Sequence, residues 1–275
     1  MIVFGGSSRQ SLVALRAGLD NALKGVSAGD ASAISTDLFK ALVAIESSTG
    51  LRRALTDSAR DTSSKSDLVS DLFKKSLGGP ALALLATATS LRWSSPSSIA
   101  DAIEQIAVEA EAAAANLSNS LDQVQSEIFT FSKLLIENPD LRTALSERAQ
   151  SPESKQALLK SIFGSKFCAS TNNLLSHSVE SNRARSIEKV ISAYSHAVTA
   201  RRNRVNAHVK SSIALSDGQA KKLADSLTKQ IGQPVHLNIE IDPSVLGGIS
   251  IRFGDEVIDG TISNRLAEAS RALVS

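Results

Sequence analysis

The chain has one cysteine, one tryptophan and one tyrosine among its 275 residues, and aromatic residues make up only 4% of it. A single cysteine, Cys168, excludes an internal disulfide and a zinc site built from several thiolates. With so few aromatic rings, the cores must be built from Leu, Ile, Val and Ala. This composition favours helix-on-helix packing over a surface that stacks on bases or sugars.

The charges are nearly balanced, with 30 basic and 28 acidic residues. A nucleic-acid-binding protein would show a concentrated basic excess, which is missing here. The longest uncharged run lies between Lys75 and Arg92 and contains Gly78, Gly79 and Pro80, so it does not predict a membrane-spanning helix. The apolar start, residues 1–6, is too short for a signal peptide. We expect a soluble protein that reaches a membrane only through a partner.

Motifs for catalysis are also missing. The chain has no phosphate-binding Walker loop, no dinucleotide-binding glycine pattern, no nucleophile elbow and no zinc-protease helix. His177 and Glu180 stand one helical turn apart, a spacing more typical of a solvated helix surface than of a metal site. Cys168 follows Phe167 in a helical pattern, where a packed side chain is the ordinary role. The sequence therefore predicts no catalytic residue, no cofactor and no metal ion.

What the chain does contain is an internal repeat. Leu51–Asp57 reads LRRALTD, and ninety positions later Leu141–Glu147 reads LRTALSE. The same offset gives these further pairs: Phe39 with Phe129, Ile45 with Leu135, Ala59 with Ala149, Lys65 with Lys155, Leu68 with Leu158, and Phe73 with Phe163. After a slip of two residues, Ile99 matches Ile187 and Ile103 matches Ile191. Matching loop lengths as well as apolar positions indicate a structural duplication of a helical bundle.

The segment Pro96–Asn138 has neither Gly nor Pro after its first residue, and its apolar residues recur at steps of three and four. The pattern predicts a long helix that joins the two bundles, roughly 60 Å at about 1.5 Å per residue if it is unbroken, and it leaves open whether it is unbroken. Polar residues at Asn116–Ser120 mark the point where this helix is expected to bend, because their side chains compete for backbone hydrogen bonds.

Near residue 203 the apolar period changes from that of a helix to that of a strand. Strands are predicted at Val205–Val209, at Val235–Ile241, at Ile249–Phe253 and at Val257–Ile258, with helices from Ser216 to Ile231 and after Thr261. Gly247 and Gly248 read as structural glycines before a strand, since a phosphate-binding loop would precede a helix. The predicted fold is mainly α, with helical bundles at 1–110 and 111–203 and a small β-α-β-β-α domain at 204–275.

The C-terminal stretch resembles a known family. The stretch contains LGGI at 246–249, GDEVIDGT at 254–261 and Arg265-Leu266. These segments resemble the C-terminal signature of the delta subunit of F-type ATP synthase. That subunit is the relative of the mitochondrial oligomycin-sensitivity-conferring protein. Its structural signature residues are Leu246, Gly247, Gly248, Gly254, Asp259 and Gly260. Thr261 stands where the family often has Ser. Asn138–Leu141 and Ser151–Lys155 resemble the family's helical domain, so the resemblance covers about residues 115–275.

The extra N-terminal bundle, including Leu91–Ser94, resembles the longer delta subunits of actinobacteria. Some of these are fused to a membrane-anchored b-type segment, and because this chain shows none, a separate b subunit is implied as a partner. The resemblance implies a non-catalytic peripheral-stalk, or stator, subunit without cofactors. It would link the N-terminal helices of the alpha subunits in the catalytic head to the b subunits. It would be held on the cytoplasmic side of the plasma membrane through the complex.

In this family the groove for the alpha-subunit helix is formed by the first and fifth helices of a bundle. By that analogy the candidate groove residues are Ile128, Leu135, Ile187, Val190 and Ile191. The same residues are more typical of a bundle core than of a partner-binding groove. The main alternative is a helical adaptor or scaffold of unrelated origin, and an enzyme without recognisable motifs is the third. Co-purification separates them, because a stator subunit comes with alpha, beta and b chains.

Overall fold

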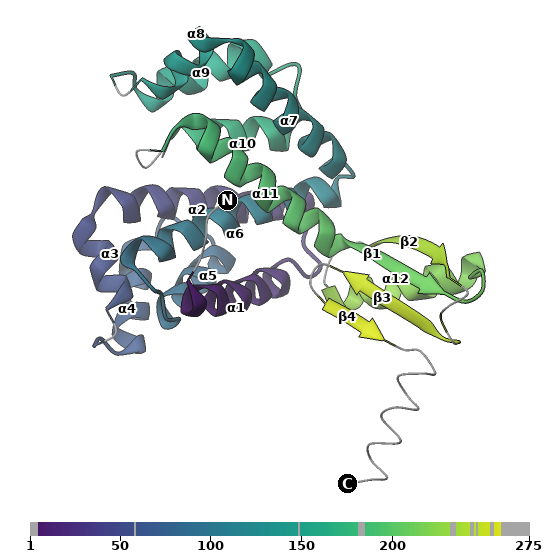
Figure 1. Cartoon of the computed structure of the whole chain (residues 1–275). Helices are drawn as coiled ribbons and strands as arrows, with labels where there is room; N and C mark the ends of the chain where they lie inside the picture. The colour runs from purple at the N-terminus through teal and green to yellow at the C-terminus, as the bar shows by residue number, and fades with distance from the viewer. Residues whose placement is uncertain are drawn as a thin grey trace. The chain divides into compact units, whose positions relative to one another are not determined.

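A computed structural model describes residues 5–57, 59–147, 149–180, 185–231, 235–242, 245, 247–253 and 256–259. The chain divides into two compact units, Met1–Thr199 and Ala200–Ser275. Figure 1 draws the first as an assembly of helices and the second as a small sheet with one labelled helix. Each unit is described by itself. Among the described residues, no helix is both long enough and apolar enough to cross a bilayer.

The helical unit is built from short helices with clear start signals. Side chains of Ser27, Ser48, Ser95 and Ser151 each accept a hydrogen bond from a backbone N–H in the first turn of the helix that follows. The helices are α1 (Gly6–Ala22), α2 (Ala28–Ser47), α3 (Thr49–Thr56), α4 (Thr62–Phe73), α5 (Gly79–Ser90), α6 (Pro96–Leu117), α7 (Leu121–Glu137), α8 (Pro139–Ser146), α9 (Pro152–Phe163), α10 (Ala169–Glu180) and α11 (Ile187–Val205).

The repeat seen in the sequence is present in the structure. The helices α8, α9 and α10 begin and end ninety residues after α3, α4 and α5, respectively. Helix α7 also ends ninety residues after α2 ends. The packing repeats as well, since α4 contacts α5 and α9 contacts α10 in the same way. Apolar residues at matching positions fill both cores, for example Phe73 and Phe163, which are both buried. Two copies of one helical unit therefore make up the first part of the chain.

Helix α6 belongs to both copies. It packs on α1, α2, α3 and α5 of the first copy, and on α7 and α10 of the second. Every residue from Ile106 to Asn116 is buried, because the helix is enclosed on all sides. Its alanines allow neighbouring helices to approach closely from several directions. The helix α1 packs on α5 in the first copy just as α6 packs on α10 in the second, so α6 is the last helix of one bundle and the first helix of the next.

The long helix predicted from Pro96 to Asn138 is not unbroken. Helix α6 ends at Leu117, Asn119 has a left-handed backbone with φ of 57°, and α7 begins at Leu121. The Ser118 Oγ donates to the carbonyl of Ala114 at 3.0 Å. Polar side chains that bond the last carbonyls, followed by an Asn in the left-handed region, terminate a helix. The copies are thus joined through the shared α6 and a short turn. The predicted boundary at 110/111 lies inside α6 and remains a prediction.

The second unit holds a four-stranded sheet in the order β2-β1-β3-β4. Its elements are β1 (Asn206–Ser211), α12 (Asp217–Ile231), β2 (His236–Ile241), β3 (Ile249–Phe253) and β4 (Glu256–Asp259). Strands β1 and β2 are parallel, and the helix α12 connects them. Strand β1 also pairs with β3, and β3 pairs with β4, both antiparallel. The core contains Ala207, Val209, Leu227, Val235 and Ile251. The predicted strands and the first predicted helix are confirmed. The helix predicted after Thr261 lies outside the described residues.

Candidate helix-binding grooves

A groove runs between α7 and α11 on the surface of the second copy. It encloses about 290 Å³ and is lined by Ser132, Leu135, Ile136, Glu188, Ser192, Ser195 and His196. Two large apolar side chains of α7 are exposed, Ile136 at 72% and Phe129 at 61%. They stand seven residues apart and so lie on the same helix face. The ammonium of Lys133 lies 5.0 Å from the centroid of the Phe129 ring. Apolar side chains beside a concave helix pair are typical of a site for another helix.

The five candidate groove residues lie mostly below this surface. Ile128, Leu135, Ile187, Val190 and Ile191 are all buried, with at most 2% exposed. Only Leu135 also lines the groove. They lie on α7 and α11, which become the second and sixth helices of the second copy once α6 is counted as its first. The first and fifth helices of that copy are α6 and α10. The assignment of these residues to a partner-binding surface remains a prediction.

Sequence reasoning did not single out Phe129 as a surface residue, nor Ile136. A signal was present, because each directly follows a residue of the core stripe, Ile128 or Leu135, and lies outside that stripe. A second apolar stripe beside the first is the pattern of a helix that buries one face and offers another. Phe129 did appear in the repeat, paired with Phe39, but its exposure differs from that of its counterpart.

The first copy has the corresponding position between α2 and α6, and most of it is covered. The counterparts of the groove-lining residues that are buried are Leu42, Ile45, Ala100, Glu104, Ala107 and Val108. Glu46, which matches Ile136, is half-buried, and with Ala100 it lines a surface pocket of about 300 Å³. Phe39, which matches Phe129, is only 2% exposed against 61% for Phe129. The same position in two copies of one unit is therefore mostly covered in one case and open in the other.

Helix α10 and the residue Arg185 after it provide the cover. The imidazole of His177 stacks on the Phe39 ring, with centroids 4.2 Å apart and planes at 14°. The Arg185 Nη2 donates to both carboxylate oxygens of Glu104 at 2.6 and 2.8 Å. The amide Nδ2 of Asn173 lies 3.3 Å from Oε1 of Glu111. Figure 1 shows α10 beside α2 and α6, as these contacts require.

The acidic residues of α6 have cationic or polar partners on opposite sides of the helix. The Arg16 guanidinium of α1 contacts the buried Glu109 at 2.6 Å, while Arg185 contacts the nearly buried Glu104 at the same distance. A buried carboxylate is tolerated only when it is paired and hydrogen-bonded. These pairs fix α6 against α1 on one side and against the second copy on the other.

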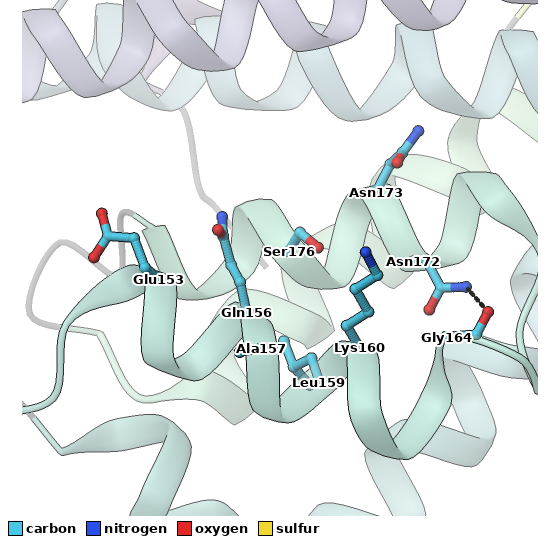
Figure 2. A pocket seen from close by; sticks show the side chains of 9 residues that line it. All are labelled: Glu153, Gln156, Ala157, Leu159, Lys160, Gly164, Asn172, Asn173 and Ser176. Carbon is cyan, nitrogen blue, oxygen red and sulfur yellow. Dashed lines mark hydrogen bonds between the residues drawn. The ribbon is translucent and has the colours of Figure 1, made fainter.

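A surface pocket of about 440 Å³ lies between α9 and α10 (Figure 2). Figure 2 shows Glu153, Gln156 and Lys160 projecting from α9, with Asn172 donating to the carbonyl of Gly164. Gln156 also donates to Glu180 at 2.8 Å. The His177 imidazole hydrogen-bonds the Glu180 carboxylate and lowers its pKa against the opposing effect of burial. The polar side chains that line the pocket thus bond neighbouring backbone carbonyls and carboxylates of the helical unit.

His177 and Glu180 thus bond each other, at 2.7 Å. Across the described part of the chain, no three His, Cys, Asp or Glu residues gather as metal ligands would. Cys168 is half-buried, and burial raises the pKa of its thiol. A raised pKa keeps the sulfur protonated and unreactive near neutral pH.

Three residues of the C-terminal signature, Gly247, Gly248 and Asp259, lie among the residues that the structure describes. Gly247 and Gly248 have φ of 68° and 81°, the left-handed region that glycine adopts without strain, and they lead directly into β3. Asp259 ends β4, opposite Ser250 of β3. Leu246, Gly254 and Gly260 lie outside the described residues. The two glycines shape the entry to the sheet.

Comparison with known proteins gives one consistent result. The sequence model of the family "ATP synthase delta (OSCP) subunit" matches residues 108–273. ATP synthase subunit delta of Streptomyces coelicolor is 37% identical over 98% of this chain and 98% of its own length. The Thermobifida fusca protein of the same name is 35% identical, also over 98% of each chain. A chain in the cryo-EM structure of the Toxoplasma gondii mitochondrial ATP synthase hexamer aligns over 61% of this chain and 97% of its own length, at 22% identity and with a TM-score of 0.28.

Proposed function

Because this chain belongs to the ATP synthase delta (OSCP) family, we propose that it is the delta subunit in the peripheral stalk of an F-type ATP synthase. In that role it performs no reaction. It holds the alpha and beta subunits of the catalytic head to the b subunits, so that the head does not turn with the rotor. The observation that carries the proposal is the match to curated delta subunits over 98% of both chains, including the additional first copy.

The surfaces of the chain support a binding role. The α7/α11 groove and the exposed Phe129 and Ile136 suit one amphipathic helix. The first and fifth helices that the resemblance implies, α6 and α10, are contacted by α2 of the first copy, so we assign the α7/α11 face to the N-terminal helix of an alpha subunit. The candidates Ile128, Leu135, Ile187, Val190 and Ile191 would then act mainly as the packed floor that fixes the two groove helices.

The second unit is assigned to the b subunits. Its outer strands β2 and β4 carry exposed apolar residues, Ile241 at 56% and Val257 at 57%. Exposed edge strands and apolar side chains together favour contact with another chain. Through b the subunit would be peripheral to the plasma membrane, on the side of the catalytic head.

The test is purification of the complex from membranes with and without this chain. An affinity tag on the chain is expected to recover alpha, beta and b subunits together. Membranes lacking the chain are expected to retain little bound catalytic head, and ATP hydrolysis in them should no longer pump protons. Recovery of other proteins in place of these subunits would favour an unrelated adaptor. Normal coupling without the chain would refute the stator role.

A further inference from the structure

The second copy meets the first through its α6/α10 face, the surface formed by its first and fifth helices. Helix α2 of the first copy lies on this face and packs on both helices (Figure 1). We propose that α2 is a built-in occupant of the α6/α10 face, so that the first copy blocks this pair of helices to a helix from another subunit. The duplication then fixes where on the chain a partner helix can bind.

Helix α2 runs antiparallel to α6 and is bonded to it by two serines. The Ser32 Oγ donates to Glu111 at 2.9 Å, and one turn later the Ser35 Oγ donates to the carbonyl of Ala107 at 2.8 Å. Ser35 and Ala107 are both buried. Helix α2 also packs on α3 and α5 of its own bundle, so it cannot leave α6 without disrupting the first copy. An occupant tethered in this way has a high effective concentration, and a free helix competes with it poorly.

The same face of α2 contacts α10. The Asn173 Nδ2 of α10 lies 3.3 Å from the Ser32 Oγ and 3.3 Å from Glu111 Oε1, so one residue from each of the three helices meets at this point. One turn further along α10, the His177 ring stacks on Phe39 with centroids 4.2 Å apart. Ser32 and Phe39 stand seven residues apart and so lie on one face of α2. This face contacts α6 and α10 together, as a helix does in the groove of two others.

The side chains of α10 that receive α2 have no equivalents on α5, the fifth helix of the first copy. Asn173 aligns with Ala83, which has no amide to donate. His177 aligns with Thr87, which has no ring to stack on an aromatic side chain. The contact with α2 therefore depends on residues that the second copy has and the first copy lacks, and it is not a general property of the repeated unit. Differences of this kind decide which helix a face accepts.

Crosslinking within the full chain tests where α2 lies. In a Cys168→Ser background, Ser32→Cys and Asn173→Cys place two thiols at contacting positions of α2 and α10. We expect a short thiol-to-thiol crosslinker to join them within one chain. The control joins the repeat equivalents, Asp122→Cys on α7 and Ala83→Cys on α5, and it should give little product because these two helices do not pack on one another. A yield no higher than that of the control would overturn the proposal.

The identity of the excluded helix rests on the proposed function, and a peptide titration of the crosslinked chain tests it. The probe is the N-terminal helix of the alpha subunit from the same ATP synthase, added in a calorimeter to the chain before and after crosslinking of α2 to α10. We expect the same Kd in both forms, within about twofold, because the peptide does not displace α2. Binding weakened at least tenfold by the crosslink would overturn the proposal. If neither form binds the peptide, the alpha-subunit assignment is refuted, and a selective crosslink still supports α2 as the occupant.

Discussion

The Glu127 carboxylate accepts a hydrogen bond from the backbone N–H of Cys168 at 3.0 Å, just before the first turn of α10. Ninety residues earlier, Asp37 accepts one from the N–H of Gly78 at 2.8 Å, just before α5. An acidic residue on the second helix thus anchors the start of the fifth helix in both copies. A carboxylate at this position satisfies an otherwise unpaired N–H and interacts favourably with the helix dipole.

Replacing Glu127 with Gln should weaken the anchor of α10. Burial raises the pKa of Glu127, but hydrogen bonds from Thr171, Gln123 and the Cys168 N–H outweigh it, so the pKa lies below its usual value. The carboxylate therefore stabilises the fold above the unfolded pKa, about 4.3, and this contribution is lost as pH falls through the folded value. We expect Glu127→Gln to lose about 1 kcal/mol of unfolding free energy at pH 7.

Urea titrations at pH 7 and at pH 3.5 measure this effect. The difference in unfolding free energy between wild type and Glu127→Gln should shrink at the lower pH, because the unfolded chain, with a glutamate pKa of about 4.3, then binds the proton and the advantage of the folded carboxylate decreases. The exposed Glu137 of the same helix supplies the control, and Glu137→Gln should change stability little at either pH. An equal loss at both pH values would assign the effect to packing and not to the charge.

The turn between α6 and α7 depends on Asn119. Its left-handed backbone, φ 57°, is accessible to Asn and Gly but costs other residues about 1 kcal/mol. Asn119→Gly should therefore be close to neutral, and Asn119→Ala should lower the free energy of unfolding by about 1 kcal/mol. Thermal unfolding followed by circular dichroism compares the two. Stabilisation by Asn119→Ala would indicate that α6 and α7 fuse into one helix, contrary to the structure.

Gly247 and Gly248 should resist substitution. Both have positive φ, so a Cβ strains either position by about 1–2 kcal/mol, and Gly247→Ala or Gly248→Ala should destabilise the second unit. Gly218, near the start of α12, has open space around it and ordinary φ, and Gly218→Ala is the matched control. Limited proteolysis should show faster cleavage after residue 200 in the first two variants only. Unchanged protection would mean that the strand entry tolerates the strain.

Polar replacement of the exposed α7 residues should separate binding from stability. Phe129→Ser and Ile136→Ser remove side chains that are largely exposed, so each should shift the unfolding free energy by less than about 0.5 kcal/mol. Binding of the alpha-subunit peptide should weaken at least tenfold, about 1.4 kcal/mol. Leu72→Ser on α4, whose side chain is 50% exposed, is expected to leave binding unchanged. A similar loss in all three would point to nonspecific contact.

Residue spacing alone determined the duplication, the change of period near residue 203 and the strands of the second unit. These are local patterns: LRRALTD and LRTALSE recur at a fixed offset, and Ile249, Ile251 and Phe253 alternate along one strand. The structural role of Gly247 and Gly248 was also readable, because they precede a strand and a phosphate-binding loop would precede a helix. Their left-handed backbone was given by the structure.

The tertiary structure alone decided where the copies meet and which groove is open. Phe39 and Phe129 occupy the same repeat position, yet one lies under His177 and the other is exposed. Only the folded chain brings α10 against α2 and α6, and it gives Glu104 and Glu109 partners some eighty and ninety residues distant. Periodicity reports which face of a helix is apolar. It does not report what packs against that face, because this depends on contacts between residues far apart in the chain.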